Sequence, residues 1–403
     1  MTEAEVIVIG GGPSGLGAAT ELARAGRRVT LLEREADAGG IPRHCGHYPF
    51  GMREFHRVLR GPDYAARLVQ RAVAAGVTLR TGTTVTSLRP GGVVEVTCDA
   101  GPETLAAKAV LLATGVRETS RAARLIGGEK PGGVMSTAAL QGIVYLNHQR
   151  PFRQPVILGT ELVAFSALLT CRHAGIRPLA MIEPGRRITA LAPAVWLARL
   201  MGVPVRLHSD IAAIHGRTRV EGVTLSTPDG PLDLAADGVI VSGGFRPDAA
   251  LLRGSHLEVD PASGGPVIDR WGRLSDPAYF AAGNLLRGVE TAGWCWSEGR
   301  RTARAILAAL EGRLPQPSGA RLTLAHPALR LAVPQVIGPG KDGSAHDRLQ
   351  IRLDRPVTGR LRLLQGERVL ASVRAASLPE RRLSLPLPAD LGPGPLILTV
   401  EER

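Results

Sequence analysis

A glycine-rich turn near the amino terminus and an acidic residue downstream have the types and spacing of a dinucleotide-binding site. The turn is Gly10-Gly11-Gly12-Pro13-Ser14-Gly15, and Glu33 lies 23 positions after Gly10. Gly10 permits a tight turn, Gly12 lets the backbone approach a pyrophosphate, and Gly15 lets the following helix pack closely on the preceding strand. The Glu33 carboxylate can accept hydrogen bonds from both hydroxyls of an adenosine ribose.

The elements needed to hold this turn are predicted on both sides of it. Residues 5–9 are a short run rich in β-branched residues, which is typical of a buried strand. Residues 16–26 are rich in alanine with apolar residues at helical spacing, and residues 28–32 predict a second strand that ends at Glu33. The helix would direct its amino-terminal N–H groups at the phosphates. Strand, turn, helix, strand and acid in this order are far more specific than the glycine pattern alone.

Later segments resemble the two-dinucleotide-binding-domain flavoprotein superfamily, of the pyridine nucleotide-disulfide oxidoreductase type. Gly39-Gly40 follow the acid where that superfamily lines the flavin, and residues 110–115 (VLLATG) are similar to its strand that returns to the cofactor. Residues 279–284 (YFAAGN) are similar to its late A-G-D element, with Asn284 in place of the usual Asp. The resemblance covers about the first 315 residues and implies FAD at the first site.

The resemblance also implies which residues contact FAD. A helix that begins after Glu290 would direct N–H groups at the flavin pyrimidine, where they can stabilise the negative charge that appears on reduction. The expected contacts come from the turn, the second strand, the later elements and this helix start, and are Gly10, Gly12, Pro13, Ser14, Gly15, Glu33, Arg34, Gly40, Ile41, Val85, Ala113, Thr114, Gly115, Gly283, Asn284, Thr291 and Ala292.

A second dinucleotide fold is predicted in the middle of the chain, but its glycine turn departs from the pattern. Strands are expected at residues 155–158 and 177–182, with a helix at 163–175 between them and Glu183 after the second strand. Glu161 takes the position of the second glycine, where added bulk and negative charge oppose a pyrophosphate. Although Glu183 would suit the ribose of NAD, NAD(P) binding is doubtful, and we expect a structural or subunit-docking domain.

The loop at residues 40–51 contains the candidate catalytic residues His44, Cys45 and His47. By the resemblance, this loop lies close to the flavin ring. A histidine there could act as a base in amine or alcohol oxidation, or stabilise the reduced flavin by its charge. These residues could instead bind a metal, which we do not expect, or pack beneath the flavin in a structural role. A single cysteine cannot form the intrachain disulfide of the disulfide reductases, so that activity is not expected.

The missing cysteine pair, the weakened second turn and the retained FAD site together resemble a narrower group. These are the flavoprotein subunits of opine oxidases, hydrogen cyanide synthases and dye-linked proline dehydrogenases. The resemblance implies hydride abstraction from a C–N bond of a small amine, imino acid or amino acid, with partner subunits that carry the substrate site or an iron–sulfur centre. Two alternatives stay open, an NAD(P)H-dependent flavin reductase with an unknown acceptor and a non-catalytic subunit that holds FAD for assembly.

Amino-acid composition limits the other classes of function. The net charge is +13, from 49 Lys and Arg against 36 Asp and Glu, but the arginines are spread along the chain, so nucleic-acid binding is not expected. An acidic partner or a membrane surface is the alternative explanation of that charge. The four cysteines have no C-x-x-C spacing, which argues against a zinc ribbon or a four-cysteine iron–sulfur site. Without a signal peptide or an apolar run of spanning length, we expect a cytoplasmic protein with no transmembrane segment.

We therefore predict an α/β protein with two Rossmann-like (three-layer ββα) dinucleotide-binding domains, one inserted in the other. A small C-terminal antiparallel β-sandwich-like domain follows, because residues 348–353, 359–364, 381–387 and 396–400 alternate apolar residues with arginine and other polar residues. The expected boundaries are an FAD-binding domain at 1–120 and 236–314, an NAD(P)-binding-like domain at 121–235, a linker at 315–319 and the β-rich domain at 320–403.

Overall fold

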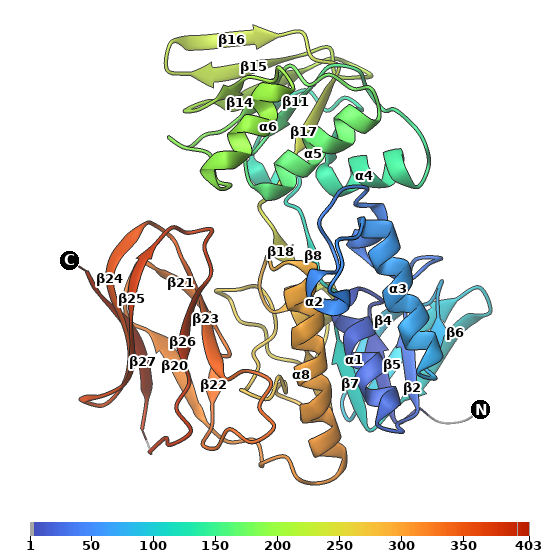
Figure 1. Ribbon diagram of the computed structural model, residues 1–403, viewed down its shortest axis with the longest axis vertical. Coiled ribbons are helices and arrows are strands. Elements are labelled where there is room, and N and C mark those ends of the chain that lie inside the picture. The colour runs from blue at the N-terminus through green and yellow to red at the C-terminus, as the bar shows by residue number, and fades with distance from the viewer. Residues whose placement is uncertain (1–3, 393, 403) are drawn as a thin grey trace.

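The computed structural model describes residues 4–392 and 394–402, which form three domains (Figure 1). The first domain contains a five-stranded parallel sheet in the order β19-β7-β1-β2-β3. Its strands are β1 (Val6–Ile9), β2 (Val29–Leu32), β3 (Thr78–Arg80), β7 (Ala109–Leu112) and β19 (Tyr279–Ala281). Strands β1, β7 and β19 are buried along their whole length, as expected of a parallel sheet covered on both faces.

Alternate side chains of these strands pack into two different cores. Val6 and Val8 face the helices α1 (Pro13–Arg24), α3 (Gly61–Ala74) and α8 (Ala292–Leu310). Ile7 and Ile9 face the three-stranded meander of β4 (Thr84–Arg89), β5 (Val93–Cys98) and β6 (Gly101–Ala106). The domain therefore has the predicted three layers of meander, sheet and helices.

The second domain repeats this plan above the first in Figure 1. Its parallel sheet has the order β10-β17-β11-β12-β13. The strands are β10 (Val134–Ser136), β11 (Pro155–Leu158), β12 (Ala180–Ile182), β13 (Val205–Arg206) and β17 (Gly238–Val241). The helices are α4 (Thr137–Tyr145), α5 (Leu162–His173) and α6 (Val195–Leu200), and the meander is β14 (Asp210–His215), β15 (Gly222–Thr227) and β16 (Gly230–Leu234) with β9 (Gly127–Gly128) at its edge.

The second domain is inserted into the first through two neighbouring segments. These segments pair as the antiparallel strands β8 (Val116–Arg117) and β18 (Arg246–Pro247). Strand β17 pairs with β11 and β10, so residues 238–241 belong to the second domain. The boundary expected between residues 235 and 236 is therefore wrong, and the chain returns to the first domain only at β18. A fully buried run of four residues fits the centre of either parallel sheet, so the burial of Gly238–Val241 alone does not fix the domain boundary.

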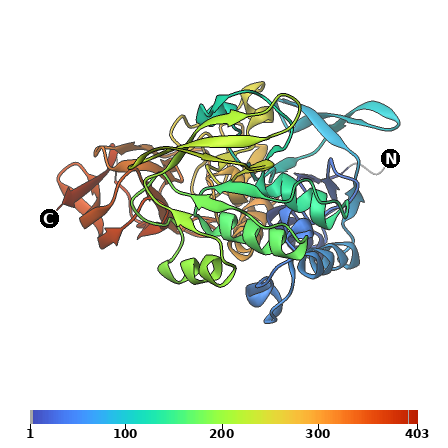
Figure 2. The ribbon, with the colours of Figure 1, turned by 90° about the horizontal axis from the view of Figure 1, so that it is seen from above.

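The C-terminal domain is a sandwich of two sheets. One has the order β22-β20-β27-β24-β25 and the other β21-β23-β26. Its strands are β20 (Ala320–Leu324), β21 (Leu329–Val333), β22 (Val336–Ile337), β23 (Arg348–Leu353), β24 (Val357–Gln365), β25 (Arg368–Ser377), β26 (Leu383–Pro386) and β27 (Leu396–Glu402). The expected antiparallel pairing holds except between β20 and β27, which run parallel. Figure 2 shows this domain at the opposite end of the molecule from the amino terminus.

The C-terminal domain packs on the first domain and is not a detached extension. Arg270 donates hydrogen bonds to the carbonyls of Gly338 and Pro388, and the Trp271 indole N–H donates to the carbonyl of Asp342. Leu331 lies in the same apolar cluster as the first sheet. The short elements that remain are α2 (Met52–Phe55), α7 (Ala250–Arg253), η1 (Ile41–His44), η2 (Ala122–Arg124), η3 (Ala192–Ala194) and η4 (Gly283–Leu285).

Candidate functional site

The carboxyl ends of β1, β2, β7 and β19 meet at one edge of the first sheet. The glycine turn follows β1, Glu33 follows β2, residues 113–115 follow β7, and Gly283 and Asn284 lie just beyond β19. Most of the residues expected to contact FAD are therefore adjacent, at the edge where parallel sheets bind ligands. Gly40 lies there as well, because a Cβ on Gly40 would be 2.8 Å from Cα of Gly12.

The glycine turn has the shape that a bound dinucleotide requires. Gly10 has a φ of +104°, and a Cβ there would be 2.5 Å from the carbonyl oxygen of Ala113. A Cβ on Gly15 would be 2.0 Å from the carbonyl oxygen of Gly10, so α1 can pack on β1 only with glycine at this position. A Cβ on Gly12 would meet nothing within 4 Å. The open side of the turn is therefore at Gly12, where a pyrophosphate can approach the backbone.

Polar groups around this turn also fit a dinucleotide. Glu33 accepts a hydrogen bond from the N–H of Gly11 at 2.8 Å, which holds its carboxylate beside the turn. The Ser14 hydroxyl is buried in the first turn of α1 without a hydrogen-bond partner in the described part of the chain. A buried hydroxyl is normally paired, so this one is available to a ligand. FAD would be held here by Glu33, Ser14 and the N–H groups at the start of α1.

The remaining expected contacts differ in how directly they face this edge. Thr291 is the N-cap of α8 and Ala292 its first residue, as the resemblance implies. Val85 is buried in the core below the sheet, whereas Ile41 is exposed at the start of η1. The Arg34 side chain is two-thirds exposed and lies 3.8 Å from the carboxylate of Asp248.

Asn284 and the start of α8 are fixed by contacts that the sequence did not reveal. The Asn284 amide donates to the carbonyl of Glu290 at 3.1 Å and accepts from the N–H of Glu290 at 2.7 Å. We call residues 279–284 the late flavin element, because the resemblance implies that they contact FAD. Gly283 of this element donates its N–H to the buried carboxylate of Glu298 at 2.9 Å. The segment from Gly283 to α8 is therefore held by its own polar contacts.

Glu298 is the centre of a buried ion cluster between the first and C-terminal domains. Its carboxylate accepts two hydrogen bonds from Arg287, at 2.9 and 3.2 Å, and one from Gln350 of β23 at 3.2 Å. His346 lies 3.6 Å away. Burial alone would raise the pKa of Glu298, but Arg287 and His346 hold it at about 2. Residues of the C-terminal domain thus contact the carboxylate that binds the late flavin element.

Sequence reasoning missed this cluster, although one signal was present. The buried face of α8 repeats at helical spacing and includes Cys295, Glu298 and Thr302. This spacing places the Glu298 carboxylate on the buried side of the helix. A buried carboxylate needs a partner. Its partners His346 and Gln350 come from a different domain, and no local pattern connects them to α8.

The buried His346 makes stability depend on pH. Burial lowers the pKa of His346 to about 4, against the opposing attraction of Glu298, with Arg287, Arg301 and Asp347 also nearby. Between pH 6.5 and 4 the unfolded chain then binds a proton that the folded chain does not, so stability falls as the pH falls. As the pH falls from 6.5 to 4, wild type should lose up to about 3 kcal/mol of unfolding free energy that His346→Gln does not lose. Urea unfolding of both proteins at each pH measures the difference. Equal losses would contradict the prediction.

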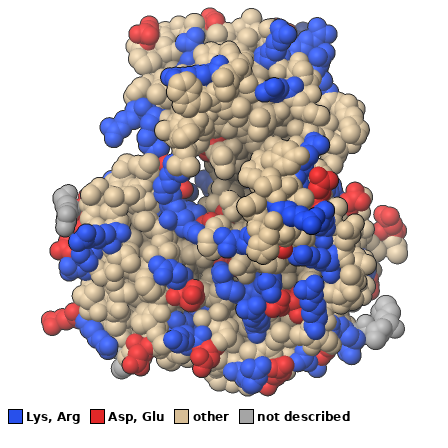
Figure 3. Space-filling view, viewed as in Figure 1, with Lys and Arg blue, Asp and Glu red and all other residues tan. Residues whose placement is uncertain are grey.

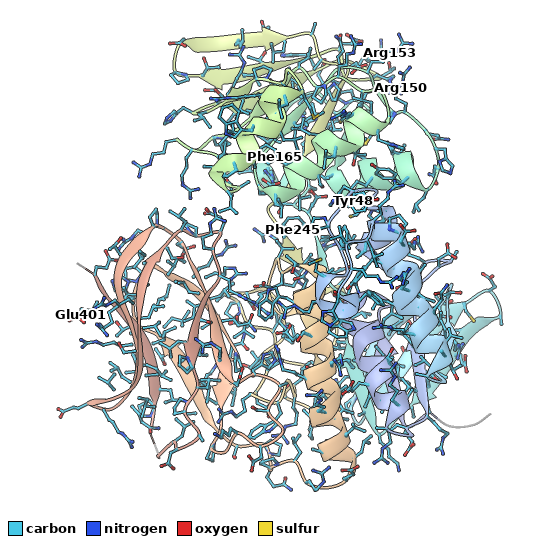
Figure 4. All side chains as sticks on the ribbon, viewed as in Figure 1. Tyr48, Arg150, Arg153, Phe165, Phe245 and Glu401 are labelled. Carbon is cyan, nitrogen blue, oxygen red and sulfur yellow. The ribbon has the colours of Figure 1, made fainter. Side chains whose placement is uncertain are left out.

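The candidate catalytic loop is packed between α3 and the second domain. Cys45 is buried, and its thiol donates to the amide oxygen of Gln141 in α4 at 3.4 Å. A Cβ on Gly46 would be 2.1 Å from the ring of Tyr145, so α4 lies directly on the loop. Tyr48 lies where the loop meets α4, and Phe245 lies in the connection between the two domains (Figure 4).

The three candidate catalytic residues in the loop differ in how well their surroundings suit acid–base or thiolate chemistry. Burial, reinforced by the Glu118 carboxylate, raises the pKa of Cys45 to about 12, so Cys45 is not suited to act as a thiolate. His44 is half-buried, its Nδ1 has no partner in the described chain, and burial lowers its pKa, which favours a neutral imidazole. His47 contacts the carbonyl of Tyr48 at 3.0 Å. His44 thus remains the best candidate for a base.

We expect Cys45→Ala to leave flavin content and turnover within about twofold of wild type, because the thiol is buried and protonated. In the native protein, Cys45 should also react with iodoacetamide far more slowly than in the urea-unfolded protein. Mass spectrometry of the alkylated peptide measures both rates. Rapid alkylation of native Cys45 would return this thiol to the catalytic candidates.

Among residues 4–392 and 394–402, no three His, Cys, Asp or Glu side chains are grouped as metal ligands.

The second glycine turn has the backbone of the first but is filled by a side chain. Gly159 has a φ of +116°, close to that of Gly10, and Glu161 is the N-cap of α5 as Gly12 is of α1. The Glu161 carboxylate accepts a hydrogen bond from Ser242 and packs against Gly243, where a Cβ would be 2.5 Å from it. It therefore lies beside the turn and the end of β17.

Other groups close this second site further. The Glu183 carboxylate accepts from the hydroxyls of Thr160 and Thr189 and from the N–H of Gly185 at 2.8 Å. Glu118 accepts from the N–H of Gly243 at 3.1 Å, so it is a second carboxylate beside Glu161. Burial raises the pKa of Glu161, against the hydrogen bond from Ser242. The Glu161 carboxylate thus occupies the second turn, with the Glu118 carboxylate beside it, whereas the first turn is open at Gly12.

The fold and the first site define an oxidoreductase of the two-dinucleotide-domain type. The profile of the family described as pyridine nucleotide-disulphide oxidoreductase matches residues 4–299, and the chain belongs to that family. No helix in the described residues is long and apolar enough to cross a membrane.

Individual relatives differ in activity. An opine oxidase subunit of Agrobacterium tumefaciens (strain Ach5) is 26% identical over 358 residues, covering 81% of this chain and 70% of the relative. The ferredoxin–NADP reductase of Salinispora arenicola (strain CNS-205) is 29% identical over 294 residues, covering 71% and 87%. The structure of T. acidophilum thioredoxin reductase has a TM-score of 0.66 at 22% identity, and the match covers 77% of this chain and all of that one. This last match confirms the fold alone.

Proposed function

We propose that this protein is the FAD-binding subunit of a dehydrogenase or oxidase that acts on a small amine, imino acid or amino acid. The observation that carries the proposal is the Glu161 carboxylate in the second glycine turn. Because this side chain fills the second turn, only the first of the two turns has open space for a pyrophosphate. The similarity to the Agrobacterium opine oxidase subunit over most of the chain supports the substrate class and the presence of partner subunits. The isolated Cys45 argues against a disulfide substrate.

Bound FAD would accept a hydride from the carbon of a C–N bond. The protein would contribute position and charge. The N–H groups at the start of α8, beyond its N-cap Thr291, would face the ring where negative charge develops on reduction. Neutral His44 in the adjacent loop could take a proton from the substrate nitrogen.

The test is an anaerobic titration of the purified yellow protein with NADH, followed at the oxidised-flavin band. We expect no bleaching by NADH and full bleaching by dithionite. Small amines, imino acids and amino acids, with the partner subunits present, should then reduce the flavin. Prompt bleaching by NADH alone would overturn the proposal.

Glu161→Ala tests whether this side chain is what excludes the nucleotide. Removing it opens the space between Gly159 and Gly243, so we expect NADH to bind at least about tenfold more tightly than to wild type. Isothermal titration calorimetry measures the affinity, and Glu221→Ala, which removes an exposed carboxylate of the same domain, is the control. Equal affinity in Glu161→Ala and wild type would show that other groups close the site.

An NAD(P)H-dependent reductase is the second candidate, favoured by the similarity to ferredoxin–NADP reductase. It requires Glu161 to move from Ser242 and Gly243 when the nucleotide binds. The same NADH titration distinguishes the two candidates.

A further inference from the structure

A polar pocket lies along the outer face of the first domain, separate from the edge of the sheet that binds FAD. Its volume is about 460 Å³, and it is lined by α1, α2, α3 and α8. Along α1 it extends from Gly17 to Arg24, so it begins one turn beyond the phosphate-facing start of that helix. The volume lies within the range of about 300–1,000 Å³ that is usual for small-molecule sites.

Four arginines, one from each of these helices, line the pocket. They are Arg24, Arg53, Arg71 and Arg300, and we call this site the arginine pocket. In Figure 3, basic residues gather on this face of the molecule, around α8 and α3. The four guanidinium groups outnumber the two carboxylates in the pocket, Glu21 and Glu54.

Both carboxylates are already committed to other groups. Glu21 pairs with Arg300 at 2.8 Å and with Arg304 at 3.1 Å. Glu54 is buried and accepts a hydrogen bond from the Tyr64 hydroxyl at 2.6 Å. Within the described residues, Arg24, Arg53 and Arg71 therefore form no ion pair with a carboxylate.

Two of these three guanidinium groups, those of Arg53 and Arg71, are nevertheless held in place. Arg53 stacks on the Trp294 ring at 4.2 Å, and Arg71 stacks on Phe55 at 4.1 Å while donating to the carbonyl of Glu54. Burial, with repulsion from Arg24 and other arginines, lowers the pKa of Arg71. Such contacts fix the orientation of a guanidinium while leaving most of its five donors unused.

We propose that the arginine pocket binds a phosphorylated small molecule with two or more negative charges. Planar guanidinium groups match the oxygens of a phosphate in paired hydrogen bonds, and the anion would relieve the repulsion between the arginines. A nucleoside diphosphate and free pyrophosphate share this chemistry. The site goes beyond the proposed oxidoreductase function, since it uses none of the residues assigned to FAD.

The test uses the FAD-loaded protein with pyrophosphate, orthophosphate and ADP at matched ionic strength, in isothermal titration calorimetry. We expect saturable binding of pyrophosphate near one per chain, with orthophosphate weaker. Tighter binding of ADP than of pyrophosphate would identify a nucleotide as the ligand, and equal binding would identify the free anion.

Variants locate the site. Arg71→Gln and Arg24→Gln should each weaken pyrophosphate binding about tenfold, because each loses a charge-assisted contact. Arg374→Gln makes the same charge change at an exposed position of β25 and should stay within about twofold of wild type. No saturable binding, or the same loss in Arg374→Gln, would overturn the proposal. The flavin spectrum and its reduction are recorded separately, so failure here leaves the proposed function untouched.

Discussion

Replacing Glu298 with leucine is expected to destabilise the protein by about 3–5 kcal/mol and to release FAD. Among the described residues, the substitution leaves the buried Arg287 guanidinium with only Glu290, 3.9 Å away, as a charged partner. It also removes the acceptor of the Gly283 N–H, at the end of the late flavin element. Urea unfolding measures the first effect, and the ratio of bound FAD to protein measures the second.

Two further variants separate charge from position at Glu298. Arg287→Leu combined with Glu298→Leu removes both members of this ion pair, so it should recover part of the stability while FAD stays weakly bound. Glu311→Gln, at the exposed end of the same helix, is the control and should leave the urea unfolding midpoint close to that of wild type. Wild-type stability and FAD content in Glu298→Leu would show that the cluster does not support the flavin element.

The contrast between Gly12 and Glu298 shows what the sequence could and could not predict. Gly12, Glu33 and Asn284 each follow a strand, and parallel strands in one sheet must end at one edge, so local patterns were enough to bring them together. The cluster of Glu298 with His346 and Gln350 depends on how the C-terminal sandwich packs on α8. That packing joins segments about 50 residues apart through tertiary contacts, and no local periodicity encodes it.

The second domain shows a different limit of prediction from the sequence. The position of Glu161 in the turn was visible from the sequence, and it predicted repulsion of a pyrophosphate. Its pairing with Ser242 and its packing on Gly243 were not visible, because β17 follows it by more than 70 residues. The domain boundary expected between residues 235 and 236 failed for a related reason, since an apolar run of four buried residues fits the centre of either parallel sheet.

Gly12→Val should weaken FAD binding without disturbing the fold, which separates the cofactor role of the turn from its structural role. Gly12 has a φ of −79° and a ψ of −177°, which valine adopts easily, and its side chain would enter open space. That space is where the pyrophosphate must approach the backbone, so we expect at least about a tenfold loss of FAD affinity with an unchanged unfolding midpoint of the FAD-free protein.

Two other glycines are the controls for Gly12. Gly15→Ala should instead lose the fold, because its Cβ would lie 2.0 Å from the carbonyl oxygen of Gly10. Gly254→Val, at another position with nothing within 4 Å and a negative φ, should bind FAD like wild type. Fluorescence titration of each FAD-free variant with FAD compares the affinities. If Gly12→Val retained wild-type affinity, the pyrophosphate would have to lie elsewhere, and the assignment of FAD to the first turn would be wrong.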